Sequence, residues 1–249
     1  MIAFEYLIIL GLVGFYLYDS AKLCFYNEFF ILKGFSAKFK LQLQNNRLSI
    51  LKKFLMIPSP FSPQYLCFIV RWQLTQTDQH NEVIQQEINH ILHIQKILKP
   101  LQALIFLNAL LMLILFPMAL LSQWNYLYMA ILIVLIYSIN IISIACVFLQ
   151  RKNLCLSNLK FSHLVVDALL CPPFALNMLQ KISLASDFKT DGIIILAQHL
   201  LQTEDFQALI SQTIADIEIL KNNHNTGPIL LQQLDLKQNY LHRLGLDSQ

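Results

Sequence analysis

Lysine and arginine are absent from three long apolar segments of this 249-residue chain, residues 2–18, 101–121 and 127–149. All 18 basic residues lie in the stretches 19–100 and 150–249. Charged residues make up 13% of the chain, compared with about 25% in a soluble domain. The sequence therefore predicts a mainly α-helical integral membrane protein, and the one-sided basic residues predict that both stretches are cytoplasmic.

Glycine is scarce, with six residues, and no glycine-rich turn is present that could cradle a phosphate or expose a nucleophilic serine. Cys155, His163 and Cys171 are eight residues apart, which is too far for the short ligand spacing of a zinc site. No basic cluster alternates with aromatic residues, so nucleic acid is not expected as a partner. These absences favour a protein that is not an enzyme and that holds no cofactor or metal.

The first apolar segment, Ile2–Tyr18, is 17 residues long, near the lower limit for crossing about 30 Å of hydrocarbon. A cleaved signal peptide is the alternative, but the start of the segment contains the acidic Glu5 and no basic residue. We therefore expect an N-terminal transmembrane anchor over residues 1–18.

The second and third segments, Leu101–Leu121 and Leu127–Leu149, are joined by five residues without lysine or arginine. Such a short connection can only join antiparallel neighbours, so residues 101–149 are expected to form a tight transmembrane hairpin. Its tip at Trp124 should face away from the cytoplasm. Three spans then place the N-terminus outside and the C-terminus in the cytoplasm, most simply in a bacterial inner membrane.

Asn108 and Asn140 are the polar residues that matter most inside this hairpin. Each is 16 residues from Trp124, so both are expected at the same depth. An amide exposed to lipid would leave its donors and acceptors unsatisfied. We therefore expect the two amides to form a structural hydrogen bond across the hairpin.

A fourth apolar stretch, Phe161–Leu179, contains Asp167 and is divided by Pro172 and Pro173. If it crossed the membrane, the basic residues that follow would lie outside, and the prolines would break the helix. We interpret residues 150–189 as a membrane-proximal interfacial segment of short helices, and a fourth span is the alternative. Asp167 is a candidate functional acid, although a structural role facing water or Lys160 is favoured.

The stretch 19–100 is expected to be a basic, amphipathic cytoplasmic region. Helices are predicted for Ala21–Leu32, from Pro63 to Gln76, and for His80–Lys99. A small β-hairpin is predicted near 38–51, with a helix as the alternative. Residues 190–249 are expected to form a cytoplasmic helical module. Its three amphipathic helices are predicted at Thr190–Leu201, Glu204–Asn222 and Pro228–Leu244.

Glu87 and His90 have the Glu-x-x-His spacing that places a carboxylate and an imidazole on one helix face, and His93 follows. Di-iron bundles use two such motifs, and this chain has one. The favoured interpretation is a solvated polar face, and a membrane metalloenzyme that uses these three residues is the less favoured alternative.

Three classes of function follow from these features. The leading hypothesis is a non-enzymatic inner-membrane anchor or scaffold, held in the lipid bilayer, whose cytoplasmic helices contact a protein partner or a second copy. The main alternative is a subunit of a transporter or channel, with Asn108, Asn140 and Asp167 along its path. The third is the metalloenzyme.

Overall fold

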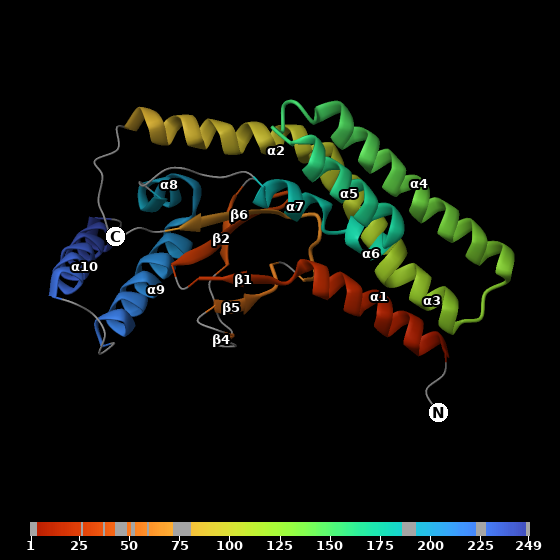
Figure 1. Cartoon of the computed structure of the whole chain (residues 1–249), viewed down its shortest axis with the longest axis horizontal. Helices are drawn as coiled ribbons and strands as arrows, with labels where there is room; N and C mark the ends of the chain where they lie inside the picture. Colours follow the sequence, from red (N-terminus) through yellow and green to blue (C-terminus); the bar gives the residue numbers. More distant parts are fainter. Residues whose placement is uncertain are drawn as a thin grey trace. The chain divides into compact units, whose positions relative to one another are not determined.

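The computed structural model describes residues 4–25, 27–36, 38–42, 49–50, 53–58, 60–71, 81–185, 193–222 and 228–247. This part of the chain is mainly helical and also contains two small three-stranded sheets (Figure 1). The chain divides into two compact units. Unit 1 comprises Met1–Lys22, Ile57–Cys67 and His93–Ser186, and unit 2 comprises Leu23–Met56, Phe68–Leu92 and Asp187–Gln249.

The longest helices come from the apolar segments. α2 (Asn81–Ala109) continues through a π-helix, η1 (Leu110–Leu115), into α3 (Phe116–Leu121), and α4 (Tyr126–Gln150) follows. Two helices are long and apolar enough to cross a membrane, Ile84–Leu121 and Tyr126–Gln150. α1 (Phe4–Ser20) is shorter, with 17 residues.

The helix boundary expected at Pro100 is absent, because Pro100 lies inside α2. Leu98, Leu101 and Ile105 are all buried on one helix face on both sides of this proline. Burial of that continuous face holds the helix together despite the missing N–H group. The helix then widens at η1, where Phe116 N–H donates to Leu111 O, five residues back. This wider turn precedes Pro117, whose ring would clash with an α-helical carbonyl.

The short connection expected between the two long helices is present as a tight turn. Trp124 N donates to Ala119 O at 3.1 Å and Gln123 N donates to Leu120 O at 3.2 Å. These bonds close the C-terminus of α3 with Gln123 in the left-handed region, at φ 51°. Asn125 then caps α4, since its side chain accepts a hydrogen bond from Leu127 N.

The fourth apolar stretch folds into α5 (Asn158–Leu170), α6 (Pro172–Ala175) and α7 (Met178–Leu184). The expected break is present at Cys171, which is extended because it precedes a proline. α5 runs back along α4 (Figure 1), with the rings of Phe148 and Phe161 5.7 Å apart. The Arg151 guanidinium lies within 6 Å of both ring centres, at 5.7 Å and 5.9 Å.

Two predicted helices in the region 19–100 are wrong. β1 (Lys22–Cys24) and β2 (Glu28–Lys33) replace the helix expected at Ala21–Leu32, and β6 (Leu66–Arg71) replaces the one expected after Pro63. All six residues of β2 are buried, so its sequence has no alternation that would distinguish a strand from a buried helix.

The predicted hairpin near 38–51 is also wrong in its pairing. β3 (Lys40–Gln42) pairs antiparallel with β2, with Ile31 opposite Leu41. β4 (Ser49–Ile50) pairs instead with β5 (Lys53–Met56). Residues 43–48 lie outside the described residues. The two segments were expected to pair with each other, but each has a different partner strand.

The three helices predicted in 190–249 are confirmed as α8 (Ile193–Leu200), α9 (Thr203–Lys221) and α10 (Pro228–Asp247). α9 buries one apolar face and packs against α10 and β3. Its first turn also fixes the edge of the sheet, because Asp205 Oδ2 accepts a hydrogen bond from Leu41 N at 3.3 Å.

Candidate functional site

Unit 1 has an apolar core, and it also buries several polar side chains and exposes many large apolar ones. Asn108, Asn140 and Ser143 are 0% exposed, whereas Val134 and Ile141 on α4 are 65% and 57% exposed. Buried polar side chains and a large exposed apolar surface are both uncommon in a soluble helical domain. The buried polar groups of unit 1 are therefore the first candidates for a functional site.

The first group lies between α2 and α4. Asn108 Nδ2 donates a hydrogen bond to Asn140 Oδ1 at 2.7 Å, which is the contact expected from their equal distance to Trp124. Within the described part of the chain, Asn108 Oδ1, Asn140 Nδ2 and Ser143 Oγ are buried without a hydrogen-bond partner. One good bond therefore joins the two helices, and three further polar atoms remain available inside unit 1.

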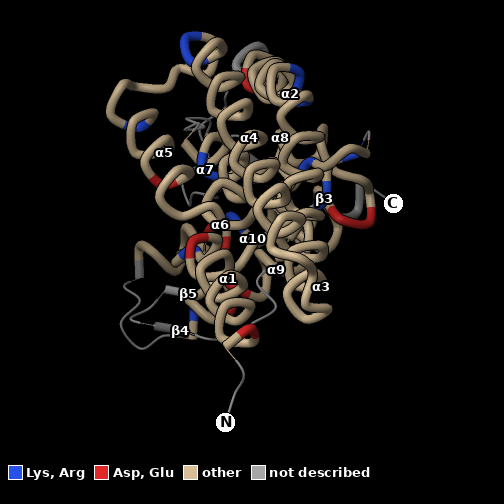
Figure 2. The backbone as a smooth tube through the Cα atoms, turned by 90° about the vertical axis from the view of Figure 1, so that its right-hand side faces the viewer, with Lys and Arg blue, Asp and Glu red and all other residues tan. Residues whose placement is uncertain are grey.

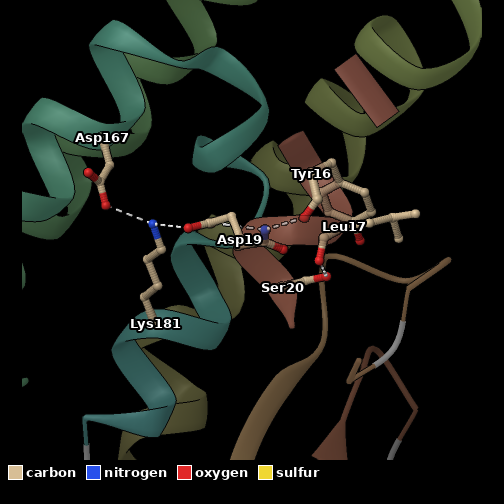
Figure 3. Close-up of polar contacts among 7 residues, drawn as sticks. Tyr16, Leu17, Asp19, Ser20, Asp167 and Lys181 are labelled. Carbon is tan, nitrogen blue, oxygen red and sulfur yellow. Dashed lines mark hydrogen bonds and ion pairs between the residues drawn. The ribbon is translucent and has the colours of Figure 1, made fainter. Parts of the chain in front are cut away.

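The second group is an ion cluster formed by Asp19, Asp167 and Lys181 (Figure 3). Lys181 Nζ on α7 lies 2.8 Å from Asp19 Oδ1 at the end of α1 and 2.8 Å from Asp167 Oδ2 on α5. The side chains of Asp19, Lys181 and Asp167 are 13%, 20% and 42% exposed. One ammonium thus joins three helices, and the cluster has a formal charge of −1.

Asp167 is half-exposed and pairs with a basic residue, as a structural role requires, but that residue is Lys181 and not Lys160. Lys160 lies two helical turns before Asp167, about 10 Å along α5, whereas Lys181 returns to Asp167 across the break at Cys171. The acid is therefore half-exposed and ion-paired, and its partner comes from the following helix.

Asn177, just before α7, extends the ion cluster. Its Nδ2 donates to Asp19 Oδ2 at 3.0 Å and to Tyr16 O at 3.1 Å. Its Oδ1 is buried and has no hydrogen-bond partner among the described residues. Exchanging the two amide atoms would direct the oxygen at two acceptors, so the observed orientation is fixed by its surroundings.

α7 also holds the segment 57–67 through buried polar side chains. Gln180 Nε2 donates to Pro58 O at 3.0 Å, and Ser183 Oγ accepts from Cys67 N at 2.8 Å. On α2, Gln102 Nε2 donates to Gln64 O at 3.1 Å. These contacts satisfy backbone groups of an irregular segment that would otherwise be costly to bury.

An apolar cavity of about 540 Å³ lies at the surface of unit 1 and is open on one side, because lining residues such as Leu7 and Phe15 are half-exposed. It is bounded by α1, by the π-helical turn, by α4 and by the proline pair at the helix break. Its lining consists of Leu7, Ile8, Gly11, Leu12, Phe15, Met112, Phe116, Ile133, Ile136, Tyr137, Pro172 and Pro173. The ring of Phe174, directly after this proline pair, lies 6.3 Å from the ring of Phe15 in the cavity lining and 5.2 Å from Lys181 Nζ. The cavity and the ion cluster are therefore neighbours.

The Glu87, His90 and His93 face lies on α2, with Glu87 and His90 half-buried and His93 exposed. In the described ranges, no three His, Cys, Asp or Glu side chains lie close enough together to hold a metal ion. The buried stripe on this helix consists of Ile84, Ile88, Ile91 and Ile94.

Sequence reasoning missed Asp19 and Lys181 as site residues. Asp19 directly follows the first apolar segment, and that position was its only signal. No family model, curated protein or solved structure matches this chain. The geometry places carboxylates, an ammonium and a buried amide in one bonded cluster near the apolar cavity.

Proposed function

We propose that this protein is a non-enzymatic, multi-pass anchor of the inner membrane whose cytoplasmic part contacts a partner protein. In this proposal α1, Ile84–Leu121 and Tyr126–Gln150 cross the bilayer. The observation that carries the proposal is the large exposed aliphatic surface of the two long apolar helices, together with the amides buried between them.

The burial of the two long helices supports membrane integration. Only 28% of the most apolar stretch of Ile84–Leu121 is buried, and 33% of that of Tyr126–Gln150. The core helix of a soluble protein would be mostly buried. Exposed aliphatic surface on this scale is costly in water and is expected in contact with lipid.

Charge placement supports the orientation. α3 and α4 contain no charged residue, as Figure 2 shows. Arg151 directly follows α4, and its contacts with Phe148 and Phe161 suit the polar interface of a bilayer. In Figure 1 the N-terminal end of α1 and the turn between α3 and α4 lie at the same end of unit 1, consistent with a shared side of the membrane.

We interpret α5–α7 as a re-entrant hairpin rather than a fourth span. α5 has 13 residues, about 20 Å, which is too short to cross about 30 Å of hydrocarbon. Lys181 pairs with Asp19 at the C-terminal end of α1. Because of this contact, α7 is expected on the side of the membrane where the C-terminal end of α1 lies.

The partner contact is proposed for α10. Ile229 and Leu236 are seven residues apart, on one helix face, and are 75% and 63% exposed. An apolar strip of this kind fits a protein partner that offers a complementary apolar surface.

Two measurements test the proposal. The full chain should remain in the membrane pellet after alkaline carbonate extraction, and its release would contradict membrane integration. Leu236→Asp should then lose a protein that co-purifies with the wild type from detergent extracts, because it places a charge in the strip. His242→Asp adds an acidic side chain at an exposed position about 120° around α10 from Leu236, and should retain that protein.

A transport function is the alternative that one observation favours. Asn108 Oδ1, Asn140 Nδ2 and Ser143 Oγ are polar atoms left without partners inside the described hairpin. If they line a path, Asn140→Leu should abolish solute flux into proteoliposomes. If no flux is measured for the wild type, the anchor proposal is favoured.

A further inference from the structure

We propose that unit 1 binds an anionic phospholipid at the end of the helical hairpin that lies opposite the Trp124 turn. The phosphate of the lipid lies among five basic side chains, and its acyl chains run along exposed apolar side chains next to them. The basic residues are Lys96, Lys99, Arg151, Lys152 and Lys160. This inference rests on the proposed membrane integration and orientation of unit 1.

The five basic residues belong to three helix ends that meet in unit 1. Lys99 is on α2, and Arg151 directly follows α4. These two helices adjoin at this level, because Pro100 and Gln150 line the same small apolar pocket. Figure 1 shows the connection between α4 and α5 beside α2. Lys160 is in the first turn of α5, and Phe161 after it packs on α4 through its ring contact.

No acidic side chain offsets the charge of this basic cluster. The sequence from Ile88 to Val166 contains no Asp or Glu, and its only Lys and Arg residues are these five. Among the described residues, none of the five takes part in an ion pair. The four lysines are exposed, and Arg151 is half-buried. Five positive charges are therefore available to an anion from outside the chain.

Arg151 is placed to bind a phosphate group next to an apolar surface. Its guanidinium lies 5.7 Å from the ring centre of Phe148 and 5.9 Å from that of Phe161. The N–H groups of a guanidinium match phosphate oxygens in pairs, and no carboxylate of the described structure occupies them. Leu149 and Leu159, close in sequence to the basic residues, are 78% and 68% exposed. One amphipathic molecule with a phosphate and acyl chains contacts both kinds of surface.

An anionic lipid fits these features better than a soluble anion does. In the proposed orientation the basic cluster lies at the cytoplasmic surface of the membrane, where anionic lipids attract basic side chains. Inorganic phosphate has no apolar part that would cover the exposed leucines. Phosphatidylcholine has the same phosphate and acyl chains but no net charge, so it is the natural comparison.

The test measures lipid retained by the full chain, purified in detergent, using native mass spectrometry. The wild type should retain dioleoyl-phosphatidylglycerol in about tenfold preference over dioleoyl-phosphatidylcholine. Millimolar inorganic phosphate should not displace the lipid. Equal retention of the two lipids, displacement by phosphate alone, or a bound acidic protein in place of the lipid would overturn the proposal.

Two double variants locate the site. Lys99→Gln with Lys152→Gln removes two exposed charges from the basic cluster and should reduce the preference for phosphatidylglycerol to about threefold or less. Lys38→Gln with Lys40→Gln is the matched control, because it removes the same charge from exposed positions of unit 2 and should keep the wild-type preference. Equal preferences in the two double variants would contradict the assignment.

Carbonate extraction of native membranes that contain the same chain separates this proposal from the proposed function. A wild type that stays in the membrane but retains the two lipids equally overturns only the lipid site. A wild type that is extracted overturns both.

Discussion

Asn108 donates a 2.7 Å hydrogen bond to Asn140 across the two longest apolar helices, and both side chains are fully buried. The bond fixes which turns of α2 and α4 face each other. Because each amide is the other's partner, removal of either one leaves a buried polar group alone.

We expect Asn140→Leu and Asn108→Leu each to reduce the free energy of unfolding by about 1–3 kcal/mol. The double variant should cost less than the sum of the two, with a coupling energy of about 0.6–1.7 kcal/mol. Unfolding in mixed detergent micelles measures all three values. Strict additivity would mean that the contact does not stabilise the hairpin.

Lys181 should be the most important member of the ion cluster. Lys181→Met leaves Asp19, which is 13% exposed, without its counter-ion and should cost about 2–3 kcal/mol. Asp167→Asn affects a half-exposed carboxylate and leaves the Asp19 pair intact, so it should cost about 0.5 kcal/mol. If the two variants unfold at the same denaturant concentration, the cluster is not organised around Lys181.

Asp216 in unit 2 should destabilise the fold at neutral pH. Burial raises its pKa from 3.8 to about 6, although Gln212 donates a hydrogen bond that opposes the shift. Between these two values the folded chain holds a proton that the unfolded chain has lost, so stability falls as pH rises from about 4 to 6.

The Asp216→Asn variant isolates this effect from the other titrating groups. Its melting temperature should exceed that of the wild type at pH 7.5, and the difference should shrink toward zero at pH 4. A difference that does not change with pH would show that Asp216 ionises in the fold as it does in solvent.

The turn of the hairpin stores strain at Gln123, which has φ 51° at the C-terminus of α3. Gln123→Gly should stabilise the protein by about 0.5 kcal/mol, because the relief of strain slightly exceeds the added entropy of the unfolded chain. Gln123→Val should destabilise it, since a β-branched residue adopts this conformation least readily. Thermal unfolding of the two variants should therefore shift in opposite directions.

The two long helices could be predicted because each comes from a long apolar segment without lysine or arginine. The tight turn could be predicted because only five residues join these segments. α9 was predicted from the periodic placement of Phe206, Ile210 and Ile217, which are buried. The contact between Asn108 and Asn140 followed from their equal spacing around a short turn. Each of these predictions depends on residues within one segment of the sequence, or on two segments that are joined by one short turn.

The strands and the ion cluster could not be predicted in this way. β2 and β6 are buried on nearly all positions, so their sequences fit a buried helix equally well. Asp19, Asp167 and Lys181 come from three separate helices. Their meeting depends on the break at Cys171 and on how α5–α7 fold back, which no local spacing encodes.

The orientation of the hairpin tests the account most directly. A reporter that is active only in the cytoplasm can be inserted at Trp124 or attached after Gln249 of the full chain. The proposed topology predicts an inactive reporter at Trp124, outside the cytoplasm, and an active one after Gln249, in the cytoplasm. Activity at both positions would contradict a membrane-crossing hairpin, and an inactive reporter after Gln249 would contradict the re-entrant interpretation of α5–α7 in favour of a fourth span.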